Sequence, residues 1–131
     1  MNILQVTNKV PYPAKDGGAI ACMNLTRGFS LLGHQVTVLA MNTLKHHVSI
    51  EEIPETVRDL ADFRLVKVPA KITRFSAMLN LLFSVKPYSA VRFISPLFKK
   101  ELIRVLKENS FDIILFHISF YSSFLILLKS L

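Results

Sequence analysis

The fold follows from residues 3–40, which read ILQVTNKVPYPAKDGGAIACMNLTRGFSLLGHQVTVLA. A short apolar run over 2–7 leads into a loop with two prolines and a Gly-Gly pair, and an amphipathic segment follows from Ile20 to Leu32. Gly33 suits the position just after a helix, because glycine tolerates a positive φ. A second apolar run covers 35–41. This order predicts strand, glycine loop, helix and strand, which is a βαβ unit.

The helix of this unit carries a recurring set of apolar residues and the only cysteine. Spacings of three and four residues predict that its buried face is formed by Ala21, Leu25, Phe29 and Leu32. Because Cys22 has no second cysteine to pair with, no disulfide can form within the chain, which is typical of a reducing compartment. We expect Cys22 to be a small buried residue rather than a reactive thiol.

The rest of the chain continues to alternate strands and helices. The expected elements are a helix over 50–60 opened by a Ser49–Glu52 capping box and disturbed by Pro54, a strand over 63–68, a basic helical segment over 71–84, a helix from Ser95-Pro96 to Asn109, a strand over 111–116 and a helix over 120–131. Strands alternating with helices predict the α/β class, with a Rossmann-like, doubly wound parallel sheet.

Length and composition bound the domain organisation. At 131 residues with 51% apolar content, the chain is at most one folded domain and is not disordered. Four strands make a thin sheet, so we expect residues 1–131 to be an incomplete domain of a longer protein. An open sheet edge would also favour a homodimer. The start of the chain lacks a secretory signal, and no run is long and apolar enough to span a membrane, which favours the cytoplasm.

The positive charge is concentrated in the second half of the chain. Residues 71–131 hold nine Lys or Arg and three Asp or Glu, whereas residues 1–70 hold seven and six. Such a surface predicts an acidic partner: anionic lipid, nucleic acid or a phosphorylated substrate. Nucleic acid is disfavoured, since no RNA-binding aromatic signature or recognition helix is present. The residues that would face an anionic membrane surface are Lys71, Arg74, Lys99, Lys100 and Arg104. The alternative is that they form an ordinary solvated face.

Two sites at the expected carboxyl edge of the sheet are candidates for chemistry. Gly17 and Gly18 precede the first helix, where bare backbone N–H groups favour a phosphate; the alternative is a simple turn. His117 ends the last strand, from which its ring can reach a ligand; the alternative is a partly buried histidine bonded to backbone. We expect no metal, because His46 and His47 are adjacent on a loop and lack a third ligand at useful spacing.

Several of these motifs occur together in one known family. They are Met1–Thr7, Pro11-Tyr12-Pro13, Asp16-Gly17-Gly18, Asn24-Leu25, the Gly-His-Gln-Val-Thr run at 33–37, and Phe111–His117. As a set they resemble the N-terminal domain of retaining GT-B glycosyltransferases of family four, also called glycosyltransferase group 1. Leu115 stands where that family has the first histidine of its later strand, and the resemblance is poor over 45–105.

The resemblance implies an acceptor-binding domain that faces a second, nucleotide-sugar-binding domain absent from this sequence. It implies that Gly17 and Gly18 contact the donor diphosphate and that His117 lies beside the transferred sugar. The nucleotide-sugar is then a substrate, and no separate cofactor is expected. The acceptor would be a glycan or a lipid-linked precursor, with the enzyme peripheral to the inner face of a membrane. The alternative is a standalone Rossmann-like module that binds a nucleotide, an anionic ligand or a partner protein.

Overall fold

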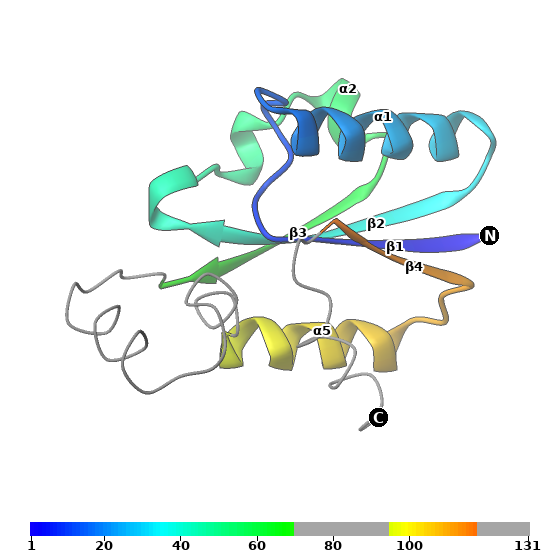
Figure 1. The fold of residues 1–131 in the computed structure, drawn as a ribbon. Helices are drawn as coiled ribbons and strands as arrows, with labels where there is room; N and C mark the ends of the chain where they lie inside the picture. The colour runs from blue at the N-terminus through cyan, green and yellow to red at the C-terminus, as the bar shows by residue number, and fades with distance from the viewer. Residues whose placement is uncertain (70–94, 118–131) are drawn as a thin grey trace.

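A computed structural model describes residues 1–69 and 95–117 of the chain. Its four strands form one parallel sheet in the order β3-β2-β1-β4, and they are β1 (Asn2–Thr7), β2 (Gln35–Thr43), β3 (Asp62–Val68) and β4 (Ile113–His117). The helices α1 (Gly17–Leu31) and α2 (Glu55–Arg58) cover one face, and α5 (Pro96–Glu108) covers the other (Figure 1). This arrangement confirms the predicted α/β class with a parallel, Rossmann-like sheet.

The strand register places the carboxyl ends of all four strands at one edge of the sheet. β1 pairs with β2 from Asn2 opposite Gln35 onward, and it pairs with β4 up to Thr7 opposite His117. The loop that follows β1 and the 3₁₀ turn that follows β2, η1 (Leu44–His46), therefore both lie at this edge (Figure 1). Ligands of open parallel sheets bind at such an edge.

The core has two parts because the sheet is covered on both faces. Toward α5, the strand residues Leu4, Val6, Leu39, Met41 and Val68 pack against Phe98, Leu102 and Val105. Toward α1 and α2, a second cluster contains Val36, Val38, Ala40 and Phe63 together with Val10, Val48 and Ile53. Successive residues of a strand point to opposite faces, so β2 supplies apolar side chains to both clusters.

The predicted buried face of α1 is wrong. Ala19, Cys22 and Thr26 are the buried residues of the helix, whereas Leu25 is 42% and Leu32 74% exposed. Ala21 is also exposed, and of the predicted set only Phe29 is half-buried. The helix is therefore turned about its axis relative to the expectation from apolar spacing.

Gln5 of β1 explains this rotation. Its side chain is fully buried and lies beneath α1, where Oε1 is 2.7 Å from the Thr26 hydroxyl and 3.3 Å from the Cys22 thiol, which donates to it. A buried amide must find hydrogen-bond partners, and a face of leucines would supply none. This side of α1 satisfies Oε1 of Gln5, whereas Nε2 is buried without a hydrogen-bond partner among the described residues.

Element boundaries agree with the sequence in part. α5 begins after Ser95, whose hydroxyl accepts the Phe98 N–H, as predicted, and Gly33 has a φ of +80° after α1. The expected helix over 50–60 is instead split into a 3₁₀ turn, η2 (Ile50–Glu52), and the short α2. The Ser49 N–H donates to the Glu52 carboxylate as a capping box requires, and Pro54 then interrupts the helix. β4 begins at Ile113, two residues later than expected.

Three expectations lie outside the described residues. They are the helical segment over 71–84, the helix over 120–131, and the placement of Lys71 and Arg74. Among the described helices, none has the length and apolar character to cross a membrane.

Candidate functional site

The structure brings two of the predicted site residues into one pocket. His117 is the last residue of β4, Gly18 lies in the first turn of α1, and both line a small hollow of about 30 Å³ at the carboxyl edge. The other residues that line it are Thr7, Asn8, Lys9, Pro11, Ala19 and Cys22. A volume this small holds about one water molecule, so the hollow is a fragment of a site rather than a complete sugar-binding pocket.

His117 is poised to interact with a ligand. The side chain is half-buried, and its Nε2 atom is inaccessible to solvent with no hydrogen-bond partner among the described residues. Desolvation lowers the pKa of this imidazole below its ordinary value of 6.5, which favours the neutral ring at pH 7. A neutral imidazole has one donor and one acceptor nitrogen, so it can pair with a hydroxyl or a carbonyl.

The start of α1 differs from the prediction in a way that matters for anion binding. The helix begins at Gly17 rather than Ile20, so both glycines belong to its first turn instead of the preceding loop. Asp16 is the N-cap, and its Oδ1 accepts the Ala19 N–H at 3.1 Å. The carboxylate therefore already occupies part of the helix N-terminus, and the Gly17 N–H has no acceptor shown among the described residues.

Lys9 compensates the charge of Asp16. The ammonium forms an ion pair with Asp16 Oδ2, and this contact is the first cause of a pKa for Asp16 below its usual value. Aspartate is a preferred N-cap residue, so Asp16 immediately before Gly17-Gly18 was the sequence signal for an earlier helix start. Lys9 carried no such signal, because its role depends on how the loop folds back.

Neither glycine is required by the fold. A Cβ atom at Gly17 would meet nothing within 4 Å, and one at Gly18 would meet only Asp16 Oδ1, at an ordinary contact distance of 3.5 Å. Neither has a positive φ, a feature found only at Gly33 among the described glycines. What the pair leaves open is space over the backbone, through which another molecule can approach closely.

A larger pocket adjoins the hollow and shares Lys9 and Ala19 with it. Its volume is about 300 Å³, and it lies between the loop after β1 and the turn after β2. The remaining lining residues are Val10, Tyr12, Pro13, Lys15, Asp16, His46, His47 and Val48. His46 and His47 are thus beside the candidate site. The described residues nevertheless contain no cluster of three or more His, Cys, Asp or Glu suited to a metal ion.

Cys22 borders the same hollow but is chemically inert. The side chain is 1% exposed, and burial raises the pKa of its thiol to about 11. Since the thiolate is the nucleophile, a thiol with this pKa stays protonated and unreactive at neutral pH. The prediction of a small buried residue is confirmed.

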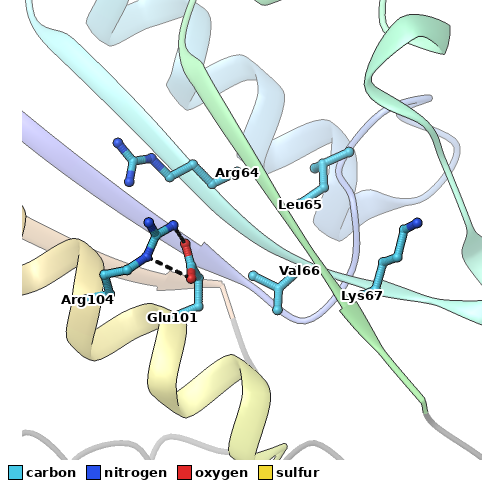
Figure 2. Close-up of a pocket in the computed structure, with 6 residues that line it drawn as sticks. All are labelled: Arg64, Leu65, Val66, Lys67, Glu101 and Arg104. Atoms are coloured by element: carbon cyan, nitrogen blue, oxygen red, sulfur yellow. Dashed lines mark hydrogen bonds and ion pairs between the residues drawn. The ribbon is translucent and has the colours of Figure 1, made fainter.

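The basic face predicted on α5 divides into two parts. Arg104 is held by carboxylates: its Nε lies 3.0 Å from Glu101 Oε2 (Figure 2). Its Nη1 lies 3.6 Å from a carboxylate oxygen of Glu108. This part of α5 lines a shallow pocket together with Arg64 and Lys67 of β3. β3 and β4, the strand that ends at His117, are the two outermost strands of the sheet, on opposite sides. Lys99 and Lys100 are exposed and form no ion pair within the described part of the chain.

Comparison of the chain with models of protein families, with curated proteins and with solved structures finds no match.

Proposed function

We propose that this chain is the N-terminal, acceptor-side domain of a retaining GT-B glycosyltransferase. Such an enzyme transfers a sugar from a nucleotide-sugar donor to a glycan or lipid-linked acceptor. One observation supports the proposal above the others: Gly18 and His117, 99 positions apart in the numbering, line the same hollow at the carboxyl edge of a parallel sheet. The resemblance assigns these two residues to the donor diphosphate and the transferred sugar.

In this proposal the glycines supply access and His117 supplies recognition. The open space over Gly17 and Gly18 lets a diphosphate approach the first turn of α1, where the helix dipole favours negative charge. Lys9 lines the hollow and neutralises the Asp16 carboxylate at this helix end, which reduces the repulsion that an approaching diphosphate would meet. His117 lines the same hollow, and its neutral ring pairs with a sugar hydroxyl.

The small size of the hollow fits a site shared between two domains. A volume of about 30 Å³ cannot enclose a sugar. A second domain opposite the carboxyl edge would supply the other wall, and transfer needs donor and acceptor held together in one orientation. The domain in isolation is therefore expected to bind ligands weakly and to transfer nothing.

The test uses the protein encoded by the complete reading frame. With a panel of nucleoside-diphosphate sugars and candidate acceptors, we expect acceptor-dependent release of the nucleoside diphosphate. Gly18→Ala should lower kcat/KM because its methyl group fills the space through which the diphosphate approaches. His117→Ala should lower it because a positioned hydrogen bond is lost, and we expect each loss to be about tenfold or more. No turnover with any donor, from folded protein, would contradict the proposal.

Matched control variants distinguish a loss of ligand contacts from a loss of stability. Gly28 lies in the last turn of α1, where a Cβ atom would also meet nothing within 4 Å, and His34 lies just before β2, at the opposite edge of the sheet. Gly28→Ala and His34→Ala should retain activity. If they reduce turnover as much as the two site variants do, the losses reflect stability and not the proposed contacts.

We further propose that α5 attaches the enzyme to an anionic membrane surface. Its solvent side carries Lys99, Lys100 and Lys107, whereas its acids Glu101 and Glu108 lie beside Arg104. These three ammonium groups form no ion pair within residues 1–69 and 95–117. Ammonium groups on one exposed helix side attract acidic head groups, and the attraction is screened by salt.

Vesicle binding tests this attachment. The protein should float with phosphatidylglycerol vesicles at low salt, and it should float less at high salt or with phosphatidylcholine alone. Charge reversal of the three lysines to Glu should abolish flotation. The control reverses three exposed cations of the opposite layer to the same net charge, namely Arg27, Lys45 and Arg58. Equal loss in both triple variants would show a net-charge effect and no defined face.

A further inference from the structure

The pocket of about 300 Å³ beside the hollow has no role in the donor contacts described above. It opens between the loop that follows β1 and the turn that follows β2, both at the carboxyl edge of the sheet (Figure 1). Its volume is at the lower end of the range for small-molecule sites and suits a ligand of about the size of one sugar.

The charges that face this pocket do not cancel. The lysine, aspartate and histidine side chains that line it are Lys9, Lys15, Asp16, His46 and His47. Asp16 is the only acid among them, and it is already engaged by Lys9 and by the Ala19 N–H. Lys15, His46 and His47 form no ion pair within the described residues. The pocket therefore presents an ammonium group and two imidazoles, all of which can donate hydrogen bonds to an anion.

Tyr12 adds an aromatic wall. The side chain is half-buried and packs against the core cluster formed around Val36 and Val38, while it also lines the pocket. An aromatic ring anchored in this way offers an apolar face with a polar tip, a combination that suits the mixed surface of a sugar. Hydrogen-bond donors and an anchored ring in one pocket suit a ligand that has an anionic group attached to a ring-sized body.

We propose that this pocket binds a sugar that carries a phosphate or a carboxylate, and that this sugar is the anionic part of the acceptor. The binding itself follows from the pocket, and only the word acceptor rests on the proposed function. Lys15 and the two histidines hold the anionic group, and Tyr12 packs against the sugar ring. The enzyme then prefers phosphorylated or uronate-bearing acceptors over neutral ones.

Calorimetric titration of the full encoded protein, without any donor, tests the pocket. The probes are glucose 6-phosphate, glucuronate and glucose, which share a body and differ in charge. We expect one or both anions to bind and neutral glucose to bind at least tenfold more weakly. Comparison of the first two probes decides between a phosphate and a carboxylate. No detectable preference for either anion over glucose would overturn the proposal.

Variants locate the binding. Lys15→Ala and the double variant His46→Ala/His47→Ala should each weaken the anion by about tenfold, as expected for lost hydrogen bonds to a charged group. Tyr12→Phe, which keeps the ring, should retain most of the affinity. Lys45→Ala is the matched control, because Lys45 is an exposed cation of the same turn that does not line the pocket. An equal loss from Lys45→Ala would overturn the proposal by showing diffuse attraction.

The two proposals fail separately. Nucleotide-sugar turnover without anion binding would refute the pocket and leave the glycosyltransferase proposal standing. Anion binding that persists in Gly18→Ala, together with no turnover in the parent protein, would refute the glycosyltransferase and leave the pocket.

Discussion

The two helices α1 and α5 pack on opposite faces of the same sheet by different means. α5 buries Phe98, Leu102 and Val105, and its contact with the strands is apolar. α1 buries Ala19, Cys22 and Thr26, and the last two hydrogen-bond to Gln5 beneath them. The residues of an apolar contact can be predicted from the spacing of apolar residues along a helix. A polar contact cannot, because it depends on a hydrogen-bond partner elsewhere in the chain. Apolar spacing therefore gave the wrong buried face for α1, whereas the buried residues of α5 do recur at apolar spacings of four and three residues.

The largest expected effect tests the apolar side. Phe98 is fully buried between α5 and the sheet, so Phe98→Ala leaves a large cavity. We expect the free energy of unfolding to fall by about 3–5 kcal/mol, measured by urea denaturation. A loss below about 1 kcal/mol would mean that the apolar contact of α5 contributes little to the stability of the fold.

An intermediate effect tests the polar side. Thr26→Val keeps the shape of the side chain but removes the hydroxyl that lies 2.7 Å from Gln5 Oε1. We expect a loss of about 1–3 kcal/mol by the same measurement, because a buried acceptor loses a partner. In a second variant that carries both Gln5→Leu and Thr26→Val, much of this loss should be recovered, because both polar groups are then gone. A double variant as unstable as Thr26→Val alone would argue against the hydrogen bond as the anchor of α1.

The smallest expected effect tests which side of α1 faces solvent. Leu32 belongs to the face predicted from spacing, but it is largely exposed. Leu32→Ser should change the free energy of unfolding by no more than about 0.5 kcal/mol, as is usual for surface positions. A loss of 2 kcal/mol or more, the size expected for truncating a buried leucine, would restore the predicted face and contradict the structure.

Much of the fold could be predicted from the sequence because local signals were strong. Ser95-Pro96 marks the start of a helix and Gly33 the end of one, because of their capping and backbone preferences. Continuous apolar runs predict strands of a parallel sheet that is covered on both faces. The buried face of α1 was missed because spacing alone contains no information about Gln5. Pro54 divided the predicted helix over 50–60, which shows that a capping box starts a helical turn without ensuring that the helix continues.

The candidate site was predictable in its parts but not in its assembly. His117 and Gly18 were identified from strand and helix ends, and the register of β4 on β1 brings them together. The role of Lys9 beside Asp16 and the pocket around Tyr12, His46 and His47 depend on loop conformation. Loops carry binding residues but lack the periodicity from which helices and strands are predicted.

The thiol of Cys22, on the buried side of α1, can be used to measure local opening of the protein. Cys22 is buried where α1 packs on the sheet, so a reagent reaches its thiol when that contact opens. The rate at which a thiol reagent labels the native protein therefore measures the free energy of lifting this one helix. Ligands that bind across the first turn of α1 should slow that labelling, so occupancy of the carboxyl edge becomes measurable without a substrate, a product or a turnover assay.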